Sequence, residues 1–228
     1  MAGSPVDCLP GIGPKRAAAL RAAGVGRVED LLFHLPLRYE DKRSAVPLSA
    51  AGGRRLYRVR VTSVSQGRSG RGGRLHRLVA LAEDEAGTVV ALCWFNQRFR
   101  ARSVEAGRCY HCFGEALLQR PGQRSSPAGL QIDNPELTMA PEGTLEPGPH
   151  IGRMVPVYRR GGGVGSTVIR TALYWLVNQT SFVAGETAAA GALRSHGFPH
   201  RGELFRGIHC PPQCCDPALL NSGRSIWH

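Results

Sequence analysis

Apolar residues recur at helical spacing over the first part of the chain. Residues 9–25 open with a Gly-x-Gly-Pro turn and continue as an Ala-rich helix that ends at Gly24, a typical C-terminal glycine. A second short helix is predicted from four apolar residues at helical spacing, Val28, Leu31, Leu32 and Leu35. Pro36 ends this helix. The pattern therefore predicts a small N-terminal helical unit that is helix-hairpin-helix-like.

From Arg55 onward the apolar positions recur every second residue. Tyr57, Val59 and Val61 alternate with basic and polar residues, which predicts a half-buried strand with one solvated face. Four more strands are predicted, at residues 75–82, 88–95, 108–118 and 130–132. A short helical stretch at 97–104 separates the third strand from the fourth. Three strands, a helix and two strands is the order of an OB-fold, a five-stranded barrel that widely binds single-stranded nucleic acid.

From Pro141 the sequence becomes rich in proline and glycine, and PEGTLEPGPHIG is typical of a linker. Beyond it, RMVPVY predicts an extended segment and residues 167–180 have the apolar content of a helix. We expect an α+β, mainly β chain in four segments, which are an N-terminal helical unit (1–50), an OB-fold (51–142), a linker with a C-terminal helical extension (143–200) and a divergent tail (201–228). The tail pattern leaves open whether it folds or is disordered.

Charge changes this picture, because the 228 residues include 29 basic and 17 acidic side chains, for a net charge of +12 and a pI of about 10.1. Such an excess favours a polyanionic partner. Lys15 and Lys42 are the only lysines, so arginines make up nearly all of the basic residues, and genomic base composition is an alternative source of part of the excess. On charge alone, non-specific binding is the alternative.

Seven cysteines without a regular framework spacing fit a reducing compartment. No apolar run approaches the roughly 18 residues of a membrane span, and the first residues lack the features of a signal peptide, so we expect a cytoplasmic protein without a membrane partner. A zinc site would have to combine Cys109, His111 and Cys112 with the distant group His209, Cys210, Cys214 and Cys215. Unpaired cysteines are the preferred interpretation, and no metal is expected.

The turn GIGPKR is the first candidate for nucleic-acid binding. Gly11 and Gly13 allow close approach of a phosphate to a helix N-terminus, and Lys15 and Arg16 add positive charge. The alternative is that the two glycines only make a tight turn, because the upstream segment is too short for a complete helix-hairpin-helix motif.

The stretch CWFNQRFRAR is the second candidate, because it interleaves aromatic residues with arginines. Alternation along the strand sends Trp94 and Phe95 to opposite faces. Phe99 follows Phe95 by one helical turn, and Arg98 and Arg100 beside it are expected to contact phosphates. An exposed aromatic pair ringed by guanidinium groups can stack on bases. The alternative is that both phenylalanines cap the open end of the barrel.

The glycine- and arginine-rich segment QGRSGRGGR is expected to be a loop after the first strand, where Arg68, Arg71 and Arg74 would contact phosphates. A nucleotide-binding P-loop needs a lysine directly before its Ser or Thr, and neither lysine of the chain stands in that context. GGGVGST, residues 161–167, is glycine-rich but lacks this lysine. We interpret it as a loop before a helix.

Residues 9–43, together with VVALCWFNQRF and MVPVYRRGGGVGSTVIRTAL, resemble the N-terminal wedge domain of the RecG-type ATP-dependent DNA helicases over about residues 7–180. GELFRGIHCPP resembles the family segment that precedes the motor. The resemblance implies an OB-fold wedge that holds branched DNA, such as a replication fork or a Holliday junction, in DNA repair and recombination while a motor pulls the duplex.

The resemblance also implies roles for particular residues. The family has two aromatic residues, at the spacing of Phe95 and Phe99, that stack on bases at the branch point. Phe99 occupies a position that resembles the family's tyrosine, so stacking is expected to survive while a hydroxyl contact is lost. Trp94 is then expected in the core.

Three functions remain open. The preferred one is a monomeric module that binds branched and single-stranded DNA, as a truncated form without motor activity and without a cofactor, whereas the full-length family uses ATP and magnesium. The second is an ATP-driven helicase, against which the missing P-loop argues. The third is a protein-interaction module, for example for a single-strand-binding protein; a motor supplied in trans is a variant of the first.

Overall fold

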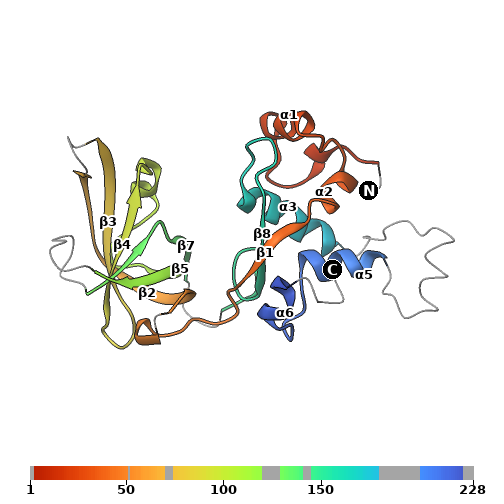
Figure 1. Ribbon diagram of the computed structural model, residues 1–228. Helices are drawn as coiled ribbons and strands as arrows, with labels where there is room; N and C mark the ends of the chain where they lie inside the picture. The colour runs from red at the N-terminus through yellow and green to blue at the C-terminus, as the bar shows by residue number, and fades with distance from the viewer. Residues whose placement is uncertain are drawn as a thin grey trace. The chain divides into compact units, whose positions relative to one another are not determined.

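A computed structural model describes residues 3–50, 52–69, 74–119, 129–140, 145–179 and 201–222. The chain divides into two compact units. The terminal unit contains Met1–Arg43 and Glu146–His228, and the central unit contains Ser44–Leu145 (Figure 1). The first, third and fourth segments expected from the sequence thus lie largely within one unit. The second corresponds to the other unit, with slightly different bounds.

The terminal unit begins with the short 3₁₀ helix η1 (Val6–Cys8) and the helices α1 (Pro14–Ala22) and α2 (Val28–Leu32). Gly24 follows α1 with φ +83°, so the predicted glycine at the helix end is confirmed. The prediction that the second helix extends to Leu35 is wrong. Leu35 lies beyond α2 with 56% of its surface exposed, because the backbone turns toward the strand β1, which begins at Pro36.

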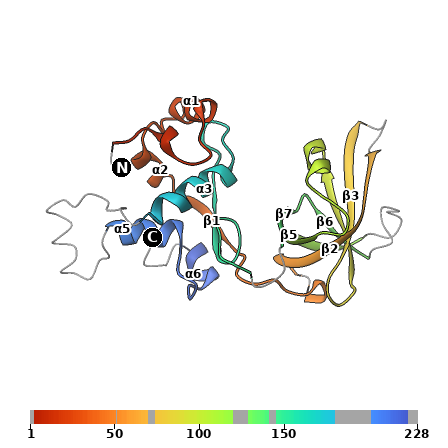
Figure 2. The same ribbon diagram turned by 180° about the vertical axis from the view of Figure 1, so that it is seen from behind.

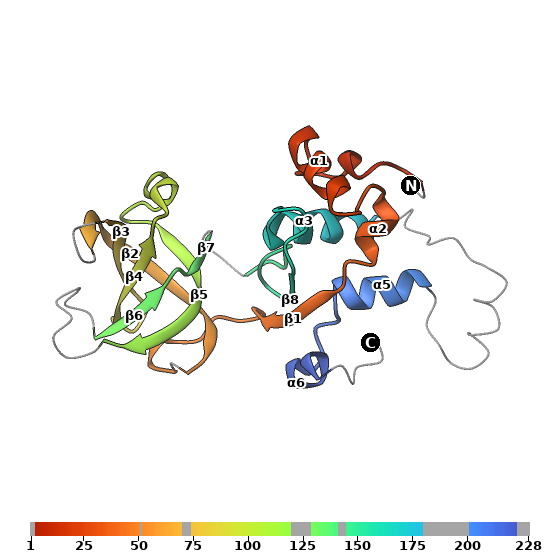
Figure 3. The ribbon, with the colours of Figure 1, turned by 45° about the horizontal axis from the view of Figure 1, so that its top comes forward.

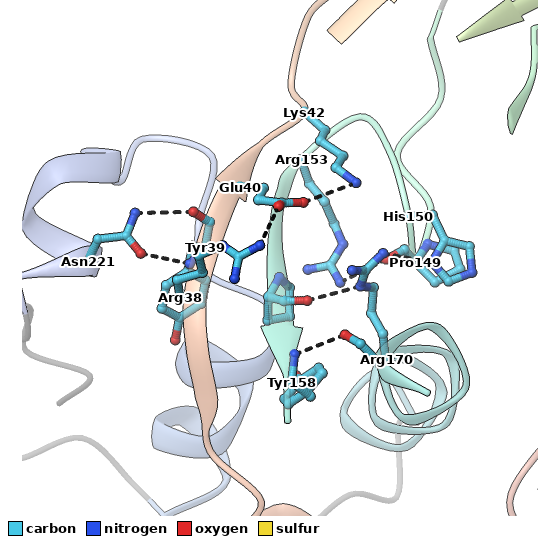
Figure 4. A network of polar contacts seen from close by, with 12 residues as sticks. Arg38, Tyr39, Glu40, Lys42, Pro149, His150, Arg153, Tyr158, Arg170 and Asn221 are labelled. Carbon is cyan, nitrogen blue, oxygen red and sulfur yellow. Dashed lines mark hydrogen bonds and ion pairs between the residues drawn. The ribbon is translucent and has the colours of Figure 1, made fainter. Parts of the chain in front are cut away.

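Two antiparallel strands, β1 (Pro36–Asp41) and β8 (Met154–Tyr158), form the sheet of the terminal unit. The extended segment predicted at RMVPVY is confirmed as β8, whereas β1 was not predicted. Side chains from two helices cover the outer edges of this sheet (Figure 4). From α6 (Pro217–Asn221), the Asn221 amide accepts from Tyr39 N at 2.7 Å and donates to Tyr39 O at 3.1 Å. These bonds satisfy a strand edge that would otherwise be open for pairing.

The outer edge of β8 is covered by α3 (Ser166–Val177), the helix predicted at 167–180. Arg170 Nε donates to Pro156 O at 2.9 Å, and Ser166 Oγ accepts from Tyr158 N at 2.9 Å. The apolar face of α3 is buried with α1 and α2 in one core. It is joined there by Phe205 of the helix α5 (Arg201–His209).

The segment GGGVGST is a tight loop that packs against α1. Figures 1 and 2, from opposite sides, show the chain between β8 and α3 next to α1. Gly162 has φ +55°, and a Cβ placed there would lie 1.9 Å from Ala19 O. Glycine is therefore required at position 162 for close approach of two backbones, and the segment is the predicted loop before a helix.

Within the divergent tail, the structure describes residues 201–222, which contain α5 and α6. Arg43 Nη1 donates to Gln213 O at 2.7 Å, and Gln213 Nε2 donates to Gly152 O at 2.8 Å. Together with the bonds of Asn221 to β1, these bonds fasten the tail to residues that follow β1 and precede β8. This part of the tail is therefore folded.

The central unit contains most of the strands, shown in Figure 3. Their bounds are β2 (Arg54–Ser69), β3 (Leu75–Glu83), β4 (Val89–Phe95), β5 (Cys109–Leu118), β6 (Leu130–Asp133) and β7 (Glu136–Met139), with the short helices η2 (Leu48–Ala50) and η3 (Arg98–Arg102). β2 pairs with β3, β3 with β4, β4 with β6, β6 with β5, and β5 again with β2. β7 is added beside β5. The chain is thus mainly β with a few helices, as predicted.

Alternation along β2 is confirmed, because Tyr57, Val59 and Val61 are all buried in the core of this unit. The predicted first strand is too short, however. β2 continues to Ser69 because it stays paired with β3, with Gln66 opposite Leu78 and Arg68 opposite His76. The loop expected at QGRSGRGGR therefore starts later than predicted.

Candidate nucleic-acid interface

The end of β4 sends neighbouring aromatic side chains to opposite faces of the sheet. Trp94 is fully buried in the core and donates through Nε1 to Pro135 O at 3.0 Å, which confirms its predicted place in the core. Phe95 is half-buried on the other face, in a small cluster with Cys93, Val79 and Leu81. Phe95 is therefore outside the core that a barrel would enclose.

Arg77 of β3 lies opposite Phe95 and was not predicted as part of the site. Its guanidinium carbon is 5.9 Å from the centroid of the Phe95 ring. Arg77 Nη2 donates to Cys93 Sγ at 3.1 Å, while burial raises the pKa of the Cys93 thiol. The thiol is thus neutral at pH 7.

Phe99 projects from η3 with 68% of its surface exposed. The guanidinium carbon of Arg100 is 5.8 Å from the centroid of the Phe99 ring. Such exposure does not fit the alternative in which Phe99 caps the core. Each ring therefore has a guanidinium group near it, as expected for a base-stacking surface.

Two of the three arginines of η3, Arg98 and Arg100, differ in environment. Arg98 is exposed. Arg100 is half-buried, and its Nε donates to Gln97 Oε1 at 3.3 Å. Burial lowers the pKa of Arg100, and the charge of Glu136 partly opposes this effect. Arg98 is thus free to reach a phosphate, whereas Arg100 is held against the protein.

Two asparagines with left-handed backbone conformation flank the corner between β4 and η3. Asn96 has φ +55° and Asn134 has φ +47°. Asn96 Oδ1 accepts from His76 N at 3.2 Å, and Asn134 Oδ1 accepts from Phe95 N at 3.2 Å. Sequence reasoning missed both residues, although asparagine directly after a strand, and the Asn-Pro pair at 134–135, are signals for such turns.

Arg68 and Arg74 are exposed, at the end of the β2–β3 hairpin. Arg68 lies on β2 rather than in a loop, which corrects its predicted position. It is paired with His76, whose backbone carbonyl accepts from Asn96 N at 2.8 Å. The structure thus brings Arg68 to the end of the sheet that carries Phe95. Arg71 lies outside the described residues.

The turn GIGPKR belongs to the terminal unit. Gly11 has φ +78°, and Gly13 is the N-cap of α1, with Pro14 at its first position. Arg16 Nη1 donates to Gly11 O at 2.7 Å and so closes the turn, while the Lys15 side chain is exposed. A tight turn and an exposed cation are both present, so the two interpretations of this motif stay open.

Among the described residues, no three His, Cys, Asp or Glu side chains lie together as metal ligands would. Cys109 and Cys112 belong to the central unit, where Cys112 is buried in the core, whereas the HCPPQCC segment belongs to the terminal unit. Among the residues that the structure describes, no helix has the length and apolar content needed to cross a membrane.

The sequence of this chain is similar to those of known proteins. The family model described as RecG wedge domain matches residues 5–175. The ATP-dependent DNA helicase RecG of Acidithiobacillus ferridurans is 31% identical over 163 residues, which cover 71% of this chain and 22% of that protein. The protein of the same name from Escherichia coli strain K12 is 26% identical over 224 residues, which cover 96% of this chain and 30% of that protein.

A solved structure, described as RecG bound to a three-way DNA junction, has the same fold. It superposes with a TM-score of 0.63 at 20% sequence identity, over 90% of this chain and 27% of that chain. The chain thus spans less than a third of the length of these relatives.

Proposed function

The chain belongs to the RecG wedge domain family, and from this premise we propose that it binds branched DNA, such as a replication fork or a Holliday junction, in DNA repair and recombination. Bases at the branch point stack on Phe95 and Phe99. The observation that carries this proposal is the exposed Phe99 ring beside Arg100, one corner away from Phe95 and Arg77.

The central unit is an OB-fold in this proposal. Its strand pairings form a circuit through β2, β3, β4, β6 and β5, and η3 lies between the third and fourth strands along the chain. This order and this circuit support a five-stranded barrel. The corner that carries the two phenylalanines would then lie at the rim of the barrel, outside its filled interior.

Phosphate contacts surround the stacking surface. Arg68, Arg74 and Arg98 are exposed cations of the central unit, and Arg71 joins them by sequence. Arg100 contributes mainly by holding its place beside Phe99. In the terminal unit, a turn offers its backbone N–H groups and positive charge to further phosphates of the DNA. The residues of this turn are Gly11, Gly13, Lys15 and Arg16.

We propose that this chain contributes DNA binding and no ATP hydrolysis. Lys42 is buried and its Nζ lies 3.3 Å from Glu40 Oε2, so it is engaged within the protein. Lys15 is on α1, outside any P-loop sequence. ATP-driven helicase activity is what the names of the relatives state for those much longer proteins.

The test is equilibrium binding to a three-way DNA junction and to a duplex of equal length, at one fixed salt concentration. Phe95→Ala with Phe99→Ala is expected to weaken junction binding about thirtyfold or more, since each base stack is worth about 1 to 3 kcal/mol. Duplex binding should hardly change. Leu118→Ala, which truncates another exposed apolar side chain of the same unit, is the matched control.

Unchanged junction affinity of the double variant would show that the rings do not stack on bases. If neither DNA is bound, and a single-strand-binding protein is bound instead, the central unit is a protein-interaction module.

A further inference from the structure

A continuous chain of polar contacts links the two rings of the proposed stacking surface. Phe95 N donates to Asn134 Oδ1 at 3.2 Å, and the same oxygen accepts from Gln97 Nε2 at 3.0 Å. The other end of the Gln97 amide, Oε1, accepts from Arg100 Nε at 3.3 Å. Arg100 in turn lies against the ring of Phe99. One amide pair therefore connects the end of β4 to η3.

We propose that Asn134 and Gln97 are positioning residues, which hold the Phe95 and Phe99 rings at a fixed separation and orientation for two unstacked bases of a branched DNA. The inference rests on the proposed function and assigns to it two residues that do not touch the DNA. They act through the backbone of Phe95 and through Arg100.

Phe99 needs such support because η3 has little packing of its own. No residue of η3 is fully buried, and Ala101 is the residue that packs partly against the core. A single turn of 3₁₀ helix does not hold its shape through internal hydrogen bonds alone. The side-chain bonds from Gln97 therefore supply the constraint that buried apolar contacts supply elsewhere.

Asn134 is placed for this task by the sheet. Cys93 of β4 pairs with Asp133 of the parallel strand β6, and Asn134 N donates to Cys93 O at 2.7 Å. Asn134 therefore stands next to Phe95 with its backbone in the left-handed region. Glycine would adopt that conformation more easily. What glycine cannot supply is the oxygen that accepts from both Phe95 and Gln97.

A ligand with two bases gains affinity from rings that are already in place, because fewer groups must be ordered on binding. If the link is broken, Phe99 keeps its exposure and its chemistry but loses its fixed geometry. The expected loss is about fivefold in junction affinity, the size typical of one lost hydrogen bond.

The variant that breaks the link is Asn134→Gly, since glycine adopts the left-handed backbone and lacks the side-chain carboxamide. Asn134→Asp keeps an acceptor at the same place and is the rescue variant. Gln131→Ala is the matched control, because the Gln131 amide donates to Asp133 Oδ1 at 2.7 Å within β6 but is not part of the link.

Two readouts separate this inference from the proposed function. The first needs no DNA, and uses NMR of the full chain with labelled phenylalanine rings. Asn134→Gly is expected to shift the resonances of both Phe95 and Phe99, and Gln131→Ala to shift neither. Unmoved Phe99 resonances in Asn134→Gly would overturn the inference, whatever the DNA results are.

The second readout is binding to a three-way junction, in a double-mutant cycle. Asn134→Gly should weaken binding about fivefold in the otherwise unchanged chain, Asn134→Asp should restore it, and Asn134→Gly should have no effect once Phe95 and Phe99 are both alanine. An equal loss in both backgrounds would mean a general structural role and would overturn the inference. If the rings shift but their removal leaves junction affinity unchanged, the proposed function fails, and the DNA role of the link fails with it.

Discussion

The buried histidine of the terminal unit makes its stability depend on pH. Tyr158 Oη lies 2.9 Å from His209 Nδ1, and His209 Nε2 lies 2.9 Å from Leu32 O. A carbonyl oxygen only accepts, so Nε2 carries the proton and Nδ1 accepts from the tyrosine. Burial lowers the pKa of His209 to about 4; the Leu32 carbonyl opposes this shift, and the charges of His34 and Arg153 add to it.

The magnitude follows from the difference between that value and the ordinary pKa of 6.5. Between pH 6.5 and about 4, the unfolded chain binds a proton at this histidine and the folded chain does not. The stabilisation is therefore fully present above pH 6.5 and is lost as the pH falls toward 4. Going from pH 7.5 to pH 5 should lower the free energy of unfolding by about 2 kcal/mol through His209 alone.

Urea unfolding at pH 7.5, 6.5 and 5.0 measures this effect. His209→Gln is the reference variant, because its amide can donate to Leu32 O and accept from Tyr158 but does not titrate. Carboxylates and the other histidines titrate in both proteins, so their contributions cancel in the difference. If both proteins lose the same stability between pH 7.5 and pH 5, the reasoning about His209 is refuted.

Three further predictions concern the fold and the DNA contacts. Trp94→Ala should cost about 3 to 5 kcal/mol of unfolding free energy, measured by urea titration, because it empties a fully buried site in the central unit. Gly162→Ala should destabilise the terminal unit by more than 2 kcal/mol, since its Cβ would meet Ala19 O, whereas Gly163→Ala, with φ +84° but open space, should cost only about 1 kcal/mol in the same assay. Arg98→Gln should lower the log-log slope of junction affinity against salt by nearly one, and an unchanged slope would exclude a phosphate contact there.

Period-two alternation predicted most of the strands of the central unit, because every second side chain of such a strand is buried on one face, as in Tyr57, Val59 and Val61. The same rule placed Trp94 in the core and Phe95 on the other face of β4. Helix ends were predicted where glycine marks them, as at Gly24.

Features that depend on distant partners could not be predicted in this way. β1 alternates poorly, and it is a strand because β8, far along the chain, pairs with it. β7 is short, and it forms beside β5. The roles of Asn134 and Gln97 depend on hydrogen bonds between segments that only the folded sheet brings together. Arg77 carried no signal in the sequence, because its place opposite Phe95 is set by the register of β3 and β4.

The central claim is that the Phe95 and Phe99 rings stack on bases at a branch point. It is tested most directly by photo-crosslinking a three-way DNA junction that carries one iodouracil, either at the branch point or in the middle of an arm, and mapping the crosslinked residue by mass spectrometry. We predict that the branch-point base crosslinks to Phe95 or Phe99 and that the arm base does not. Crosslinks from the branch point that map only to other residues would contradict the account.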